Sequence, residues 1–246
     1  MGFSYSPKVV TDGLVLYLDA ANPLSYASGS TKWRDLSKKK NHFDLVNSYG
    51  FESGSIYFDY DNQGYAQKQI SRETTPELVP VFESFTVEAC YKMHTTGSRL
   101  KYIGTGNYGQ GGWNLGVGYS DFNFVDFSAY ALELQDLYGT NQQYKGGAAQ
   151  SGHDNSIDNF QFYQIVFNMD TNYTDLYVNG ALLSSAYDGS RGTGAYNVTS
   201  YKIGRSPQGG WGNGKGHFAL LKQYNRALTA QEVQRNYQAL KSRFGL

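Results

Sequence analysis

Two acidic stretches are the first candidates for chemistry in this sequence. Asp59 and Asp61 are two positions apart, and Glu133 and Asp136 are three apart. Glycosidic bonds are hydrolysed by two carboxyl groups that flank the bond, and alternate residues of a strand share one face. Glu133 and Asp136 have the wrong spacing for this. Asp61 is followed at once by a turn, with no third acid nearby. We therefore interpret Asp59 as a structural acceptor in a turn and predict no catalytic residue.

Nucleophilic catalysis has no better support. The sequence has no Gly-x-Ser-x-Gly elbow, and the four histidines, at positions 42, 94, 153 and 217, lie in unrelated contexts. The lone cysteine, Cys90, cannot form an internal disulfide, and it lies within a predicted strand. We interpret it as a small buried hydrophobic residue.

Two glycine-rich loops carry side chains suited to sugar binding, one at residues 106–114 and one at 209–217. An aromatic ring covers the apolar face of a sugar, while amide groups bond its hydroxyls. Trp211 is the better aromatic candidate because glycines surround it, whereas Trp113 opens a strand and is assigned to the core. The alternative for both loops is a flexible hairpin end or a contact with a neighbouring subunit. The candidate sugar-binding residues are Trp211, Asn213, Tyr108 and Asn107.

Oxygen-rich loops provide a candidate calcium site, because Ca²⁺ prefers carboxylate and carbonyl oxygens. The predicted ligands are Asp59, Asp61 and Asn62, and a second such loop lies at residues 153–155. The alternative is that these side chains form Asx-turns with the backbone. We predict no other cofactor.

Three segments are candidates for docking on a partner protein. The lysine run 38–40 suits a phosphate or an acidic partner, although three lysines in a loop more often form a solvated tip. Residues 137–158 have little periodicity, and loops of this length are often functional or disordered. Residues 1–11 read as an arm that is either loose or docked on a neighbour, so we expect its deletion to leave the fold intact but to weaken assembly. The candidate docking residues are Lys38, Lys39, Lys40 and Tyr144.

The composition excludes some functional classes. The 246 residues have 21 basic and 21 acidic side chains, so the formal charge is zero. This balance argues against nucleic-acid binding and against general attraction to anionic membranes. No apolar run is long enough to insert into a membrane. Residues 1–12 lack the features of a signal peptide, which predicts synthesis in a cytosol.

The stretch that positions much of the chain is 160–185, which reads as three antiparallel strands. Aromatic and β-branched residues fill the first of them, and Asn179-Gly180 is a strong signal for a type I′ turn between the second and third. One face of the second strand is apolar. Its other face carries Tyr177, which we expect to be solvated or to cover a groove.

Elsewhere, residues 84–93 show clean alternation, with Phe85, Val87, Ala89 and Tyr91 on one face and Thr86, Glu88, Cys90 and Lys92 on the other. Residues 67–80 read as a polar connector. Thr229 and Glu232 form a capping box that starts a C-terminal helix. Further short strands are expected at 14–19, 43–46, 55–58, 99–104, 113–119, within 122–134, and at 201–205 and 217–224. These elements predict an all-β, two-sheet antiparallel sandwich with one terminal helix, comprising an arm at 1–12 and a single domain at 13–246.

Seven stretches of the sequence match one family in order. They are 13–19, 33–37, 57–59, 84–89, 176–180, 203–205 and 224–229. Together they resemble the laminin-G-like jelly rolls of the concanavalin A-like lectin/glucanase superfamily. Catalytic members of this superfamily carry Glu-x-Asp-x-Glu along one strand, and this sequence has no such run. The position that often carries an acidic pair in the family is Ala219-Leu220 here, which departs from the family's calcium site.

Residues 13–22 (GLVLYLDAAN) and 237–246 (YQALKSRFGL) are similar to virion structural proteins of tailed bacteriophages. That resemblance implies a non-catalytic particle component, such as a capsid decoration, a fibre or a tail-associated adhesin. Other virion proteins would be its partners, with an oligomer formed in the assembly and host-surface glycan as a further partner. A lectin-like module is the alternative function, and a glycoside hydrolase is the second alternative.

Overall fold

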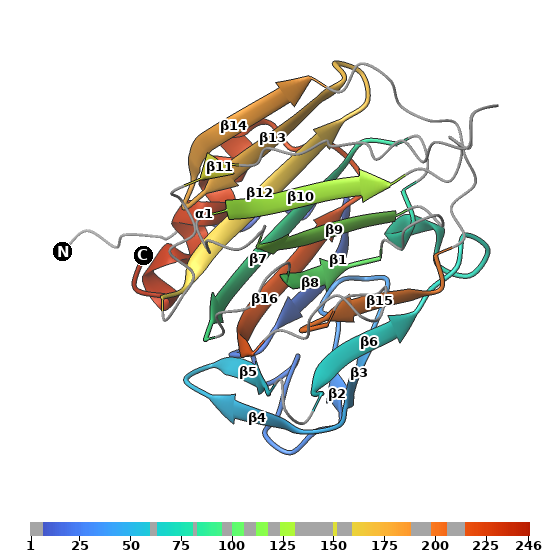
Figure 1. The fold of residues 1–246 in the computed structure, drawn as a ribbon, viewed down its shortest axis with the longest axis vertical. Helices are drawn as coiled ribbons and strands as arrows, with labels where there is room; N and C mark the ends of the chain where they lie inside the picture. The colour runs from blue at the N-terminus through green and yellow to red at the C-terminus, as the bar shows by residue number, and fades with distance from the viewer. Residues whose placement is uncertain are drawn as a thin grey trace.

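The residues that the computed structural model describes form two antiparallel sheets packed face to face, with one α-helix on the outside (Figure 1). The residues that the structure describes are 7–59, 63–80, 83–94, 100–105, 112–117, 124–130, 150–151, 159–187, 198–205 and 215–246.

Sheet A contains eight of the described strands. Seven lie side by side in the order β14 (Ala181–Tyr187), β13 (Tyr173–Val178), β12 (Gln161–Asn168), β7 (Phe85–Met93), β16 (Gly216–Tyr224), β5 (Ser55–Phe58) and β4 (Tyr49–Glu52). The eighth, β1 (Leu14–Asp19), pairs with the C-terminal part of β16, whereas β5 pairs with its N-terminal residues.

Sheet B also contains eight described strands. Their order is β11 (Gln150–Ser151), β10 (Phe124–Tyr130), β9 (Gly112–Val117), β8 (Leu100–Gly104), β15 (Ser200–Ile203), β6 (Tyr65–Gln69), β3 (Phe43–Val46) and β2 (Lys32–Trp33). The helical segments are α1 (Ala230–Leu240) and two 3-10 turns, η1 (Pro76–Leu78) and η2 (Lys241–Arg243). The fold class predicted from the sequence is therefore confirmed.

Aromatic side chains from both sheets fill the space between them. Phe85 of β7 lies 6.2 Å, between ring centroids, from Trp113 of β9, and Trp113 lies 5.3 Å from Tyr201 of β15. Tyr201 in turn lies 5.2 Å from Phe43 of β3. Aromatic pairs at such spacings stabilise a core beyond the area that they bury. The assignment of Trp113 to the core is confirmed.

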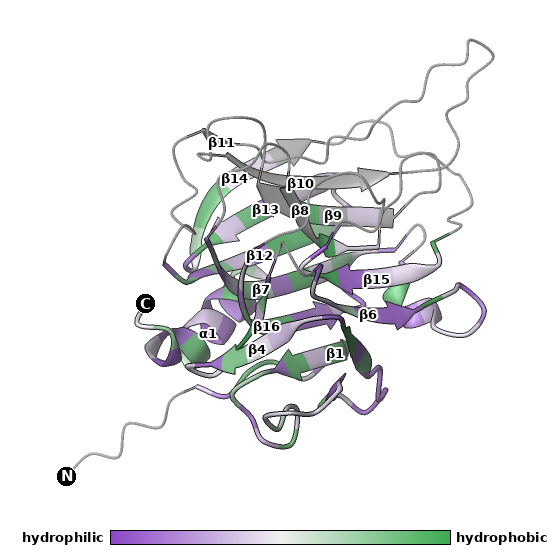
Figure 2. Ribbon diagram, turned by 60° about the horizontal axis from the view of Figure 1, so that its bottom comes forward, coloured by the Kyte–Doolittle hydropathy of each residue, from purple (hydrophilic) through white to green (hydrophobic). Residues whose placement is uncertain are grey.

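The outer face of sheet A is buried as well, because α1 lies across it (Figure 2). On β7 the predicted alternation is confirmed: the Phe85 side belongs to the inner core, while Cys90, on the opposite face, packs with Leu240 of α1. Tyr177 packs with Val233 of α1 and is only 8% exposed. The prediction that Tyr177 is solvated or covers a groove is therefore wrong. In the described residues, no helix has the length and apolarity needed to cross a membrane.

Local signals located most of the elements correctly. Asn179 and Gly180 both have positive φ angles, as a type I′ turn requires, and Thr229 and Glu232 form the predicted capping box. The polar connector at 67–80 is partly wrong. Its first residues belong to β6, whose residues are mostly hydrophilic (Figure 2) and of which only Ala66 is buried. Ile70, Leu78 and Val79 then return to the core. β4 was also missed.

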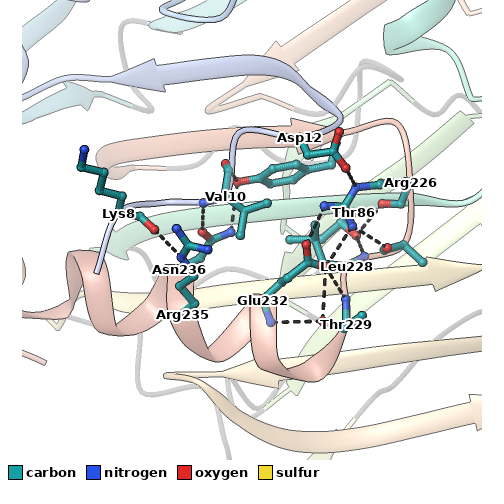
Figure 3. A network of polar contacts seen from close by, with 12 residues as sticks. Lys8, Val10, Asp12, Thr86, Arg226, Leu228, Thr229, Glu232, Arg235 and Asn236 are labelled. Carbon is teal, nitrogen blue, oxygen red and sulfur yellow. Dashed lines mark hydrogen bonds and ion pairs between the residues drawn. The ribbon is translucent and has the colours of Figure 1, made fainter. Parts of the chain in front are cut away.

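The N-terminal segment docks on the chain's own helix. Asn236 of α1 accepts a hydrogen bond from the Val10 N–H at 2.7 Å, and the Tyr224 hydroxyl donates to the Val10 carbonyl at 3.1 Å. Nearer the N-terminus, Arg235 donates to the Lys8 carbonyl at 2.7 Å (Figure 3). Val10 is 5% exposed and packs beside Val233. For residues 8–10, these contacts with the chain's own helix differ from the loose or neighbour-docked arm that the sequence predicts, while residues 1–6 lie outside the described residues.

Removing residues 1–10 should therefore destabilise the fold, contrary to the expectation from sequence. The deletion exposes apolar surface that Val10 covers and leaves the buried Asn236 side chain short of one partner. Together these losses should lower the free energy of unfolding by about 2–4 kcal/mol, measured by urea denaturation. Removing only residues 2–7 keeps the Lys8 and Val10 contacts and is the matched control. Equal stability of the two truncated proteins would contradict the docking.

Candidate functional site

Strand ends from both sheets meet at the root of the loop that carries Trp211. The end of β5 and the end of β7 both pair with the start of β16, and the start of β6 pairs with the end of β15. Residues 206–214 connect β15 in sheet B with β16 in sheet A. The two sheets touch here, because a Cβ built on Gly204 would lie 2.5 Å from the Phe58 ring. The described residues around this loop form the candidate site.

On the sheet B side, two cations lie over one tyrosine ring. The Lys202 ammonium is 5.8 Å, and the Arg205 guanidinium 5.2 Å, from the centroid of Tyr65. All three residues are half-buried. We call Tyr65, Lys202 and Arg205 the Tyr65 platform. Burial, and after it the positive charge of Arg205, lowers the pKa of Lys202.

The backbone of Gly204 explains how Arg205 joins this platform. Ile203 faces the core, so simple alternation along β15 would point residue 205 inward as well. Gly204 has a φ angle of +84°, which L-residues with a side chain rarely adopt. This turn ends the regular alternation, and the Arg205 guanidinium lies over Tyr65 instead.

On the sheet A side, two histidines and a tyrosine pack together. The His217 ring lies 4.9 Å from the Tyr57 ring and 4.9 Å from the His94 ring. Burial lowers the pKa of His217 to about 4, with smaller contributions from the charges of Lys92 and His94. The imidazole is therefore neutral at pH 7. We call Ser55, Tyr57, His94 and His217 the His217 cluster.

The hydrogen bonds of Ser55 assign the tautomer of His217. The Ser55 hydroxyl lies 3.0 Å from Nδ1 of His217 and donates to the Glu52 carbonyl at 2.7 Å. A hydroxyl has one hydrogen to donate, so we assign the imidazole hydrogen to Nδ1. Nε2 is then the acceptor nitrogen of the ring.

An ion pair and a backbone hydrogen bond hold the C-terminal root of the loop. Lys215 lies 3.7 Å from the Asp59 carboxylate, and its carbonyl accepts from the His94 N–H at 2.8 Å. Asp59 thus contacts a cation of the protein itself, while Asp61 and Asn62, the other predicted calcium ligands, lie outside the described residues. Across the described ranges, no three His, Cys, Asp or Glu side chains gather as metal ligands would. Calcium binding stays a prediction.

The predicted sugar-binding and docking residues are only partly described. Trp211, Asn213, Tyr108, Asn107 and Tyr144 all lie outside the described residues. The strands that lead into the two glycine-rich loops are β8 and β15, which are antiparallel neighbours. Their C-terminal ends therefore point in opposite directions along sheet B.

The lysine run 38–40 is exposed and lies at a different end of the sandwich from the Tyr65 platform. Asp35 shapes the turn before it, accepting hydrogen bonds from the backbone N–H groups of Tyr17, Ser37 and Asn41. The Ser37 hydroxyl donates a hydrogen bond to the Val15 carbonyl of β1. The start of β1 pairs with the C-terminal end of β16, whereas Lys215 lies at the N-terminal end of β16. The two cationic surfaces are therefore separate.

Sequence reasoning missed a buried ion pair between sheet A and α1. The Lys222 ammonium lies 2.5 Å from a Glu88 carboxylate oxygen, and both side chains are fully buried. The other carboxylate oxygen accepts from Gln164 at 2.6 Å and from Asn236 at 2.9 Å. The alternation of β7 placed Glu88 opposite the core, but nothing in the sequence pairs it with Lys222. Glu88 is enclosed in this network, so it cannot meet a substrate.

One family model matches residues 61–234, which is more than half of the chain, and its description is the concanavalin A-like lectin/glucanases superfamily. This chain belongs to that superfamily. The match confirms the resemblance seen in the sequence at the level of the superfamily. No curated protein sequence matches the chain.

Solved structures share the fold at low sequence identity. A botulinum neurotoxin DC binding domain in complex with SialylT has a TM-score of 0.66 and 15% identity, and the match covers 94% of this chain and 52% of that one. A structure titled as a receptor binding domain has a TM-score of 0.68 and 14% identity, covering 94% and 51%. Trypanosoma rangeli sialidase in complex with sialic acid has a TM-score of 0.65 and 15% identity, covering 98% and 36%. The chain thus spans about half or less of the length of these proteins.

Proposed function

We propose that this chain is a carbohydrate-binding module that works by adhesion and not by catalysis. The proposal depends on the residues that flank loop 206–214. The Tyr65 platform lies at the N-terminal end of this loop, and the His217 cluster lies at its C-terminal end. Aromatic rings with hydrogen-bonding groups at a loop root are the usual parts of a sugar site. Membership of a superfamily that includes lectins supports the same function, as does the shared fold with a neurotoxin binding domain in complex with SialylT and a sialidase in complex with sialic acid.

The buried carboxylates favour binding over hydrolysis. Glu88 pairs with Lys222, Asp19 is held by both terminal nitrogens of Arg243, and Asp35 shapes a turn. An acid fixed in this way is unsuited to exchange a proton with a substrate. Assays on β-glucans and alginates are expected to show no cleavage.

Substituting Trp211 tests the sugar-binding proposal. We expect wild type to bind a subset of glycans on an array, and Trp211→Ala to weaken that binding at least tenfold, because a stacked indole contributes much of the contact in such sites. Tyr173→Ala, which removes an exposed aromatic residue from β13, is the matched control and should bind as wild type does. If the wild type bound no glycan on the array, the proposal would be contradicted and a purely structural role would be favoured.

The finer proposal is that the module serves in the virion of a tailed bacteriophage. It is supported by the similarity of residues 13–22 and 237–246 to such proteins, and by the exposed lysine run 38–40, which is available to other virion proteins. Locating the chain in intact particles by electron microscopy tests this role, and its absence from purified particles would rule the role out.

A further inference from the structure

We propose that the Tyr65 platform binds an anionic saccharide, with Lys202 and Arg205 contacting the carboxylate or sulfate group of the sugar. The inference rests on the proposed function and adds to it the chemical class of the ligand and the residues that select it.

The arrangement of charge on the platform favours an anion. Lys202 and Arg205 both lie within 6 Å of the centroid of one ring, at 5.8 and 5.2 Å. The positive charge of Arg205 contributes to lowering the pKa of Lys202, so the two cations repel each other. An anion that contacts both of them would offset this repulsion. The planar guanidinium of Arg205 also matches the two oxygens of a carboxylate or sulfate.

The platform is built to hold the two cations in place. The π face of Tyr65 attracts both of them, and Tyr65 and Lys202 stand on the paired strands β6 and β15. Gly204, packed against Phe58, turns the chain so that Arg205 reaches the ring. Contacts that hold both cations near the ring reduce the entropy that is lost when a ligand binds.

A basic residue stands at each end of the loop. Arg205 is the last described residue before loop 206–214, and Lys215 is the first described residue after it. Lys215 lies 3.7 Å from the Asp59 carboxylate, so its charge already has a partner. Arg205, on the Tyr65 platform, is therefore the cation beside the loop that an acidic sugar would meet.

The test measures binding of three polysaccharides by calorimetry at low salt: polygalacturonate, which carries carboxylates, dextran sulfate, which carries sulfates, and neutral dextran. We expect wild type to bind at least one of the anionic probes and to prefer it over dextran. Arg205→Gln and Lys202→Gln should each weaken that binding by roughly 10- to 100-fold, as expected when one charged hydrogen bond is lost. Lys38→Gln, which removes an exposed cation from the separate lysine run, should leave it unchanged.

Further measurements separate the outcomes. Lowering the pH to about 3, below the pKa of a sugar carboxylate, should abolish binding of polygalacturonate and spare binding of dextran sulfate. Thermal unfolding of each variant checks that the fold persists. Anionic binding that is unaffected by Arg205→Gln and Lys202→Gln would overturn the inference. Preference for neutral glycans, lost in Trp211→Ala, would overturn it while the proposed function stands. Failure of every glycan would overturn both.

Discussion

Glu88→Gln should lower the free energy of unfolding by about 3–5 kcal/mol, one of the two largest effects expected of a single substitution in this protein. The substitution keeps the size of the side chain but removes the charge that faces Lys222. The ammonium then stays fully buried with no compensating charge. Urea denaturation at neutral pH measures the difference.

A double variant separates the burial of charge from the loss of packing. Glu88→Gln with Lys222→Met removes both charges and replaces the lysine stem with an apolar chain of similar length. It should recover most of the lost stability, since a buried ion pair is often no better than an apolar pair of the same volume. The exposed pair of Lys32 and Asp44, with side chains 54% and 61% accessible, is the matched control. Asp44→Asn should cost about 1 kcal/mol or less. A similar cost at both sites would show that the Glu88 pair is not buried in solution.

Gly64→Ala should destabilise the protein by about 3 kcal/mol or more, because no space exists for a side chain. A Cβ at this position would lie 1.8 Å from the Ser48 carbonyl oxygen, which belongs to the backbone and cannot rotate away. Gly64 also donates its N–H to the Asp59 carbonyl at 3.2 Å and precedes Tyr65. The shift that relieves the clash therefore moves the Tyr65 platform, and binding of anionic polysaccharide should fall as well.

Gly50→Ala is the control for that substitution. Gly50 lies on β4, and the nearest atoms to its added Cβ would be in the Tyr57 side chain at 3.9 Å, an ordinary contact. We expect its unfolding free energy to stay within about 0.5 kcal/mol of wild type. If Gly64→Ala melted at the same temperature as Gly50→Ala, the close approach of Ser48 and Gly64 would not exist in solution.

The helix shows how local and distant information combine. Its start is set by Thr229 and Glu232, three residues apart, and Arg226 pairs with Glu232 through both terminal nitrogens, which lowers the pKa of that carboxyl to about 2. What the helix covers depends on residues from β7, β12 and the N-terminal segment. These meet only when the sandwich is complete.

The sequence by itself determined the features that depend on neighbours in the chain. Alternation along β7, the turn at Asn179 and Gly180, and the capping box at Thr229 each lie within ten residues, so short-range periodicity and turn chemistry reveal them. The two-sheet fold follows from such elements. Seven short motifs in the order typical of the family indicated the superfamily.

Only the tertiary structure decided the contacts between distant parts of the chain. Glu88 and Asn236 are separated by 148 positions, and Val10 and Asn236 by 226. The Tyr65 platform likewise joins a residue of β6 to two at the end of β15. A sequence with zero formal charge gave no sign of this cationic surface, because net charge averages over the whole molecule, whereas folding gathers particular charges at one place. Sheet pairing sets these neighbours, and no pattern in a single sequence encodes which strands lie side by side.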